Sequence, residues 1–122
     1  MKERSTAAFA FACAAALACG AVACKRSEAK RDAQAEAQKT FAMVCARCHG
    51  PGGGGDGLSP SLAAPPRNFR DASFHRERSD EDLARVIREG KGGMPPFRSV
   101  YTPEQITALV QVIRGFNPEK KR

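Results

Sequence analysis

The residues in this 122-residue chain that could do chemistry together are two cysteines and a histidine. They lie in the stretch Cys45-Ala46-Arg47-Cys48-His49, whose C-x-x-C-H spacing is typical of covalent haem attachment. If this stretch ends a helix, the two thiols lie one turn apart, and the imidazole, four residues after Cys45, falls on nearly the same face. The pattern therefore predicts two thioether bonds to a porphyrin, through Cys45 and Cys48, and an iron ligand at His49.

Two other chemistries use paired cysteines. A zinc site needs a second pair of ligands, but the remaining cysteines, Cys13, Cys19 and Cys24, all belong to the N-terminal apolar stretch. A thioredoxin-like dithiol needs a strand before its first cysteine, and no strand-like run precedes Cys45. A chance match to so short a motif is the remaining alternative, which the rest of the chain has to argue against.

The stretch from Gly90 to Phe97 presents one methionine, Met94, in a loop with glycines before it and two prolines after it. Glycine lets the backbone approach a cofactor closely, and proline restricts the segment that follows. A thioether ligand has to reach the iron from the face opposite His49 and be held rigidly there, so we predict Met94 as the second axial ligand. His75 is the competing candidate, but its neighbours in residues 74–78 suggest a solvated polar segment.

The residues between the two candidate ligands predict a loop that wraps the cofactor. Residues 50–57 are mostly glycine, which allows positive φ and a tight turn around the proximal side. A metal-bound histidine donates its other ring proton to a carbonyl or carboxylate, and we predict the carbonyl of Pro60 as that acceptor. Leu62 and Phe69 are the predicted wall residues of the pocket. The glycines also fit G-x-G-x-x-G, but no strand precedes them, so a dinucleotide site is excluded.

Three helices are expected to position these loops. The first begins near Ala35 and runs into the cysteine motif. The second starts at an N-cap Ser79, has acidic residues in its first turn, and ends at Gly90, which suits the left-handed C′ position. The third starts at Thr102 and has the proline and glutamine of a near-complete capping box. Its apolar residues recur at helical spacing: Ile106, Leu109, Val110, Ile113 and either Val112 or Phe116.

Residues 1–23 read as an export signal, with a basic start, an Ala-rich apolar run and an A-x-A cleavage site just before Cys24. The four residues that end at Cys24 are also similar to a bacterial lipoprotein signal, whose cysteine is acylated. Cys19 offers a rival site, and plain secretion or an uncleaved anchor are the alternatives. A lipid at Cys24 would attach the mature protein to a membrane.

The remaining chain is expected to form a polar tether at residues 24–38 and one small domain at residues 39–122. The chain is basic, with a formal charge of +7 and a pI near 9.5. Its positive residues are scattered among acids and its aromatics are few, which argues against nucleic-acid binding. Acidic protein surfaces are the expected partners. Four basic residues lie near the motifs and could surround the cofactor edge: Lys39, Arg47, Lys91 and Arg98.

Several motifs occur in one order along the chain: Phe41-x-x-x-Cys45-x-x-Cys48-His49-Gly50, Pro60-x-Leu62, Gly90-x-x-x-Met94-Pro95 and the terminal helix. Together they resemble class I c-type cytochromes of the small bacterial single-haem kind. The resemblance implies an all-α fold of three main helices, with Gly/Pro-rich loops wrapped around one covalently bound haem c. It also implies that the first and last helices cross near the haem edge, with Phe41 packed on Leu109 and Val112.

The function implied by the resemblance is electron transfer rather than catalysis. His49 and Met94 together would fill both axial positions and leave none for a substrate. The expected role is to carry electrons between periplasmic or membrane-bound redox partners. Two alternatives stay open: a haem subunit of a larger respiratory or dehydrogenase complex, and a haem sensor or enzyme with a labile Met94.

Overall fold

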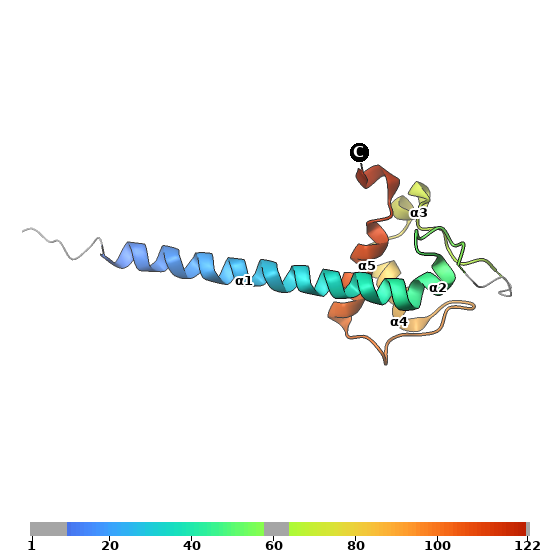
Figure 1. Cartoon of the computed structure of the whole chain (residues 1–122), viewed down its shortest axis with the longest axis horizontal. Coiled ribbons are helices and arrows are strands. Elements are labelled where there is room, and N and C mark those ends of the chain that lie inside the picture. Colours follow the sequence, from blue (N-terminus) through green and yellow to red (C-terminus); the bar gives the residue numbers. More distant parts are fainter. Residues whose placement is uncertain (1–9, 58–63, 122) are drawn as a thin grey trace, which may run out of the picture. The chain divides into compact units, whose positions relative to one another are not determined.

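The computed structural model describes residues 10–57 and 64–121, and the chain divides into two units, residues 1–32 and 33–122. Helix α1 (Ala10–Thr40) supplies the described part of the first unit (Figure 1). The sequence predicts a helix that begins near Ala35, whereas α1 begins much earlier, at Ala10. Within the described ranges, no helix combines the length and the hydropathy of a membrane span.

The cysteine motif lies on a helical run with one irregular turn. After α1 the chain forms a π-helical turn, η1 (Phe41–Cys45), and then a short helix, α2 (Ala46–His49). The Ala46 amide donates to the carbonyl of Phe41, five residues earlier, so one extra residue is accommodated in this turn. The buried positions Ala37, Phe41 and Ala46 are accordingly spaced by four and then by five residues. The π turn keeps Phe41 and Ala46 on the buried face.

Helices α4 (Asp80–Glu89) and α5 (Pro103–Arg114) begin where the sequence predicts. Each has a complete capping box, Ser79 with Asp82 and Thr102 with Gln105, in which the side chains and backbone amides satisfy one another. Gly90 ends α4 with a φ of +75°, positive as predicted, but its ψ of +170° lies outside the left-handed helical region that was expected. A final 3₁₀ turn, η2 (Pro118–Lys121), follows α5.

The chain between the glycine loop and α4 contains a helix that the sequence did not predict, α3 (Ala72–Glu77). Its N-cap is Asp71, whose side chain accepts from the Ser73 amide at 2.9 Å. Phe74 and His75 are buried in it, so the expectation that residues 74–78 form a solvated segment is wrong for these two. The Phe74 ring packs on that of Phe69 with the centroids 5.6 Å apart, and both ring nitrogens of His75 have hydrogen-bond partners.

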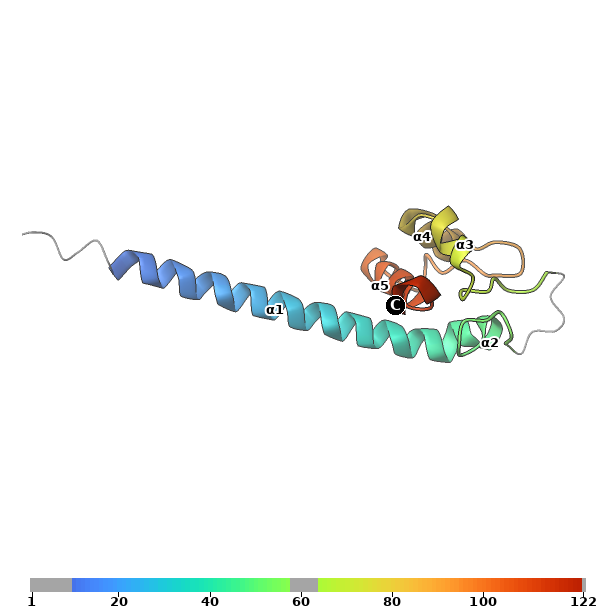
Figure 2. The ribbon, with the colours of Figure 1, turned by 90° about the horizontal axis from the view of Figure 1, so that it is seen from above.

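The core lies against α5, whose predicted stripe is buried: Ile106, Leu109, Val110 and Ile113. From α4 it receives Leu83, Ala84 and Ile87. A cluster of phenylalanines joins the cysteine helix to the rest: the Phe41 ring centroid lies 5.1 Å from that of Phe116 and 6.3 Å from that of Phe69. Figure 2 shows α3, α4 and α5 grouped on the same side of α2. The prediction of an all-α fold is confirmed, since the described residues form helices and no strand.

The resemblance implied that Phe41 packs on Leu109 and Val112. The ring contacts of Phe41 are with Phe69 and Phe116, while Leu109 lines the same pocket as Phe41. The aromatic partner from the C-terminal end of the chain is therefore Phe116, which lies just beyond the end of α5. The last turns of α1 and the first half of α5 face each other across a groove lined by Ala33, Glu36, Ala37, Thr40, Tyr101, Glu104, Gln105, Ala108 and Leu109.

Candidate cofactor site

The glycine loop fixes the backbone of His49, the last residue of α2. The Gly55 amide donates to the His49 carbonyl at 2.8 Å, and the Gly57 amide donates to the Cys48 carbonyl at 3.2 Å. These bonds satisfy two of the carbonyls that a helix end leaves free. Gly55 has a φ of +77°, and a Cβ there would collide with the Pro66 carbonyl oxygen. Only glycine therefore lets the loop fold back so closely behind His49.

The His49 ring is held from its other side by the segment around Arg67. Its Nδ1 lies 3.2 Å from the Arg67 carbonyl oxygen. Because a carbonyl can only accept, Nδ1 carries the proton and Nε2 keeps its lone pair free for a metal. The Phe69 ring stacks on the imidazole with the centroids 4.4 Å apart and an interplanar angle of 18°. Burial lowers the pKa of His49, opposed in part by the Arg67 carbonyl, so the ring is in the neutral form that binds iron.

The two cysteines of the motif are both half-buried, and no disulfide joins them. Cys45 ends η1 and lines the pocket described below, whereas Cys48, one turn later, is not among the lining residues. Burial raises the pKa of Cys45 to about 11, with a smaller contribution from Cys48 and an opposing backbone hydrogen bond. Redox-active dithiols require a lowered thiol pKa. This burial differs from the accessible, electropositive setting in which the pKa of a reactive thiol is lowered.

Met94 is fixed by a loop that folds back on the end of α4. Lys91 and Met94 exchange both backbone hydrogen bonds, at 3.1 and 3.0 Å. Beyond the two prolines, the Phe97 amide donates to the Ile87 carbonyl at 3.0 Å. The loop thereby supplies a hydrogen-bond donor to a backbone carbonyl that the end of α4 would leave free. The position of Met94 is set from both sides, as a rigid ligand requires.

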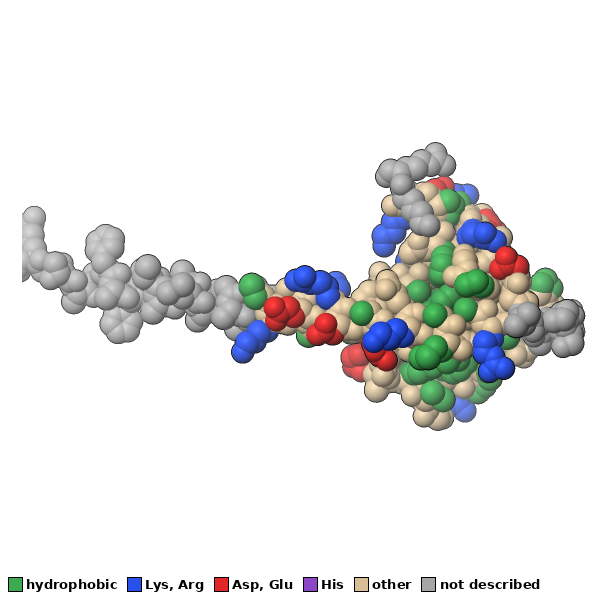
Figure 3. All heavy atoms as spheres, viewed as in Figure 1, with side chains coloured by type: hydrophobic (Ala, Val, Ile, Leu, Met, Phe, Trp, Pro, Cys, Tyr) green, Lys and Arg blue, Asp and Glu red, His purple; other side chains and the backbone are tan. Residues whose placement is uncertain are grey.

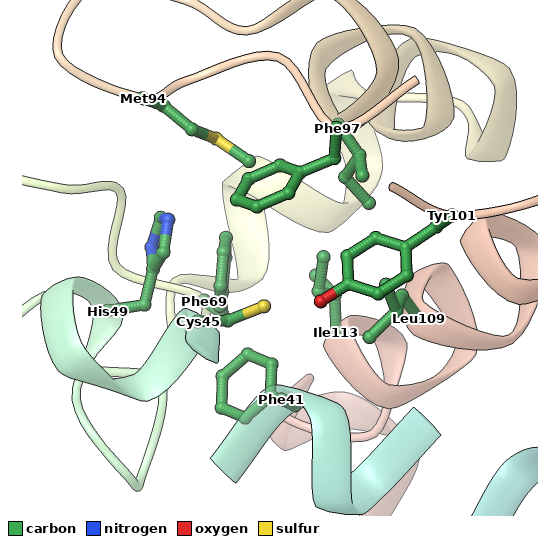
Figure 4. A pocket seen from close by; sticks show the side chains of 10 residues that line it. Phe41, Cys45, His49, Phe69, Met94, Phe97, Tyr101, Leu109 and Ile113 are labelled. Carbon is green, nitrogen blue, oxygen red and sulfur yellow. The ribbon is translucent and has the colours of Figure 1, made fainter. Parts of the chain in front are cut away.

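The candidate ligands meet in one apolar pocket. Figure 4 shows the His49 and Met94 side chains pointing into it, from α2 and from the loop after α4. The pocket is lined by Phe41, Cys45, His49, Phe69, Ile87, Met94, Phe97, Tyr101, Leu109 and Ile113. Apart from the cysteine, histidine and methionine donors and the tyrosine hydroxyl, this lining is hydrocarbon. The structure thus gathers, from segments far apart in the sequence, donors suited to iron and walls suited to a porphyrin.

Of the predicted site residues, Cys45, His49, Met94 and Phe69 line this pocket together. Pro60 and Leu62 lie outside the described residues. The carbonyl that the structure gives to His49 Nδ1 belongs to Arg67. That acceptor carries no sequence signal, because any residue has a backbone carbonyl.

Tyr101 was not predicted in the pocket, although a signal for it exists. It directly precedes the N-cap Thr102, a position from which an apolar residue often packs against the first turns of the helix, and Tyr101 packs against the core. The Tyr101 ring stacks on that of Phe97 with the centroids 5.7 Å apart. Burial raises the pKa of the Tyr101 phenol, and Cys45 adds to the effect. The hydroxyl is therefore neutral at physiological pH.

The donors present fit a covalently bound haem. Two thiols one turn apart can form the two thioether bonds, and the free Nε2 of His49 and the thioether of Met94 are ligands that haem iron takes. Among the described residues, no group of three or more His, Cys, Asp or Glu side chains is arranged to hold a metal ion. That arrangement is what a zinc centre would require, so the donor set favours haem over zinc.

Comparison with known proteins gives consistent matches. A family model described as "Cytochrome C oxidase, cbb3-type, subunit III" matches residues 32–113. Among solved structures, a protein described as the KustC0563 c-type cytochrome is 40% identical, with a TM-score of 0.59, and the match covers 66% of this chain and 95% of that one. A chain of a Kuenenia stuttgartiensis reducing HAO-like protein complex, Kustc0457/Kustc0458, is 31% identical with a TM-score of 0.58. That match covers 70% of this chain and 43% of the other. No curated protein matches the chain significantly.

Proposed function

This chain belongs to the family described as Cytochrome C oxidase, cbb3-type, subunit III, and is a class I c-type cytochrome that transfers electrons through covalently bound haem; within that activity we propose a single haem c held by four residues. Cys45 and Cys48 form its thioether bonds, and His49 and Met94 are the axial ligands. The observation that carries this proposal is that His49 and Met94 point into one apolar pocket from separate segments of the chain (Figure 4).

The four residues divide the work of an electron carrier. When bound, haem c supplies an iron that takes up and releases one electron. With His49 and Met94 both holding the iron, the site would offer no position to oxygen or a substrate, so we propose that the protein is not an enzyme. The neutral thioether of Met94 favours the ferrous state over what a second histidine would give. The apolar walls act in the same direction, because burial disfavours the more positive ferric state.

The decisive experiment is an optical redox titration of the protein matured in a host that attaches haem. We expect a low-spin spectrum, one redox transition at positive potential and a methionine-to-iron charge-transfer band. Met94→Ala should abolish that band and lower the potential. Met43→Ala is the matched control, because Met43 is 67% exposed on the helix and does not line the pocket. A Met94→Ala spectrum identical to that of the wild type would remove Met94 from the site.

Partners are proposed from the distribution of charge. On the face drawn in Figure 3, Lys and Arg side chains, with some Asp and Glu among them, border an area of apolar side chains. Arg47, Lys91 and Arg98 are exposed near the motifs, whereas Lys39 pairs with Glu36 at 3.4 Å. We expect acidic docking surfaces on redox partners, with association that slows as ionic strength rises. A rate of electron exchange with an acidic redox protein that is independent of salt would contradict this.

A second candidate role is a fixed haem subunit of a larger respiratory or dehydrogenase complex. Two findings favour it: the description of the matched family names an oxidase subunit, and one similar chain belongs to a protein complex. Isolation from the native membrane or periplasm separates the two roles, because a carrier elutes as a monomer and a subunit within an assembly. A sensor with a labile Met94 would instead bind carbon monoxide when reduced at neutral pH.

We also propose export to the periplasm and, in one version, anchoring by a lipid on Cys24. Cys24 is an exposed free cysteine. Intact mass of the membrane fraction, compared between the wild type and Cys24→Ser, tests the anchor. Acylation of the wild type alone is the expected result, and a soluble unacylated wild type would leave plain secretion.

A further inference from the structure

A buried histidine outside the pocket is fully hydrogen-bonded. His75, on α3, is 8% exposed, and its Nε2 lies 2.7 Å from the carbonyl oxygen of Phe69. Its Nδ1 lies 3.2 Å from Nη1 of Arg114. A carbonyl only accepts and a guanidinium only donates, so Nε2 carries the proton and Nδ1 accepts. The ring is held in one tautomer and one orientation by two partners of fixed polarity.

Arg114 fixes this arrangement from the end of α5. Its side chain is 15% exposed and donates to the carbonyl of His75 at 3.0 Å, to the carbonyl of Arg78 at 2.5 Å, and to the carboxylate of Asp80 at 2.7 Å. The Asp80 carboxylate also accepts from Gln111 at 3.2 Å. Because Arg114 joins α5 to α3 and to the start of α4, His75 is braced by three helices.

The Phe69 carbonyl that His75 binds belongs to residues 67–69, the segment that contacts His49, the candidate iron ligand. Phe69 stacks its ring on His49, and the carbonyl of Arg67, two residues earlier, lies 3.2 Å from His49 Nδ1. Phe69 is also tied to the glycine loop, since its amide donates to the Gly53 carbonyl at 2.6 Å. The His75 bond therefore restrains a three-residue segment that makes two separate contacts with His49.

We propose that His75 and Arg114 are positioning residues that set the hydrogen bond of His49, and through it the reduction potential of the site. The inference rests on the proposed role of His49 as the iron ligand. A carbonyl that accepts from Nδ1 makes the imidazole a stronger donor, which stabilises ferric iron. If residues 67–69 are no longer held by His75, the hydrogen bond from His49 Nδ1 to the Arg67 carbonyl weakens. The ferrous state then becomes more stable relative to the ferric state.

The test uses the full-length haem-loaded protein and compares two substitutions of the same residue. His75→Leu removes both hydrogen bonds, whereas His75→Gln keeps an amide N–H that can donate to the Phe69 carbonyl. Arg76→Gln is the matched control, because Arg76 lies on the same helix with its side chain 60% exposed and pairs with Glu119 at the surface. Haem content, reduction potential and NMR exchange of the His49 Nδ1 proton in the reduced protein are measured for each.

We expect normal haem content throughout. His75→Leu should raise the potential and speed exchange of the His49 proton roughly tenfold, as loss of one hydrogen bond would. His75→Gln should recover most of both values, and Arg76→Gln should change neither. If His75→Leu does not fold, Arg114→Gln is expected to shift both measurements in the same direction.

Two results distinguish a failure of this inference from a failure of the proposed function. Unchanged potential and proton exchange in a folded, haem-loaded His75→Leu or Arg114→Gln would overturn this inference and leave the proposed function intact. A wild-type protein that attaches no haem would overturn both. A shift in His75→Leu that His75→Gln does not reduce at all would also count against the inference, because it would indicate general loosening of the core.

Discussion

Gly90 lies against the backbone of the loop that carries Met94, and replacing it by alanine gives a quantitative test of the loop geometry. Gly90 has φ +75° and ψ +170°, a conformation almost restricted to glycine. A Cβ built there would lie 2.5 Å from the Met94 carbonyl oxygen and 2.9 Å from the Pro95 carbonyl carbon. Both atoms are backbone, so they cannot move aside without displacing the loop that carries Met94.

The expected cost has two parts. Holding alanine in this backbone conformation costs about 1–3 kcal/mol. Overpacking against rigid neighbours costs about 1–3 kcal/mol more. Gly90→Ala should therefore lower the free energy of unfolding by about 2–6 kcal/mol, unless the loop shifts and Met94 detaches. Each 1.4 kcal/mol or so of strain relieved by detachment raises the detached fraction about tenfold.

Gly92→Ala is the matched control. Gly92 also has a positive φ, +59°, but a Cβ there would meet nothing within 4 Å. Gly92→Ala should lower the free energy of unfolding only by the cost of holding alanine at a positive φ, about 1–2 kcal/mol. The two variants thus differ in the clash with the Met94 loop, and both carry a strained alanine.

The assay is guanidinium unfolding of the haem-loaded protein, with the methionine-to-iron charge-transfer band and carbon monoxide binding recorded on the same samples. Gly90→Ala should unfold at lower denaturant than Gly92→Ala, lose intensity in the band and bind carbon monoxide when reduced. Equal destabilisation of the two variants, with the band intact in both, would refute the claim that Gly90 positions Met94.

Two further predictions concern the scaffold. Ile106 is 1% exposed in the core, so Ile106→Ala should lower the free energy of unfolding by about 2–5 kcal/mol. Val100 is 63% exposed, so Val100→Ala should change that free energy by less than about 0.5 kcal/mol. Denaturant unfolding measures both, and similar losses in the two variants would contradict the burial of Ile106. In the α4 capping box, hydrogen bonds from the Ser79 side chain and amide lower the pKa of Asp82 below its ordinary 3.8. The stability that they contribute is present above that ordinary value and lost as pH falls through the lower folded-state value. Asp82→Ala should therefore be less stable than the wild type at pH 7, with a difference that vanishes in acid, and a difference independent of pH would contradict this account.

Features encoded within a few residues could be predicted from the sequence. The C-x-x-C-H motif, the two capping boxes and the glycine at the end of α4 depend on residues three to five apart, which the chain brings together whenever it forms a helix. The buried stripe of α5 follows in the same way, because apolar residues at helical spacing share one face. Met94 could be chosen as a candidate ligand because the glycines and prolines beside it suggest a restricted loop, and the structure places it in the pocket with His49.

The π turn lay beyond this reasoning. The sequence places Phe41 four residues before Cys45, which in a regular helix would put both on one face. The structure places Ala46 on the buried side together with Phe41, through a hydrogen bond across five residues, and Cys45 still lines the pocket with Phe41. The same turn carries Phe41, whose ring packs with those of Phe69 and Phe116 from distant segments of the chain.

The sequence by itself thus determined the cofactor motif, the candidate ligands and the helices that carry them. Only the tertiary structure decided which carbonyl meets His49, that of Arg67, 18 residues away. It also decided that His75 and Arg114, 39 residues apart, pair with each other beside the segment that contacts His49. His75 is polar and its neighbours are charged, so local composition suggested a solvated segment. It is buried because partners from distant segments satisfy both of its nitrogens, and such compensation exists only once the chain has folded.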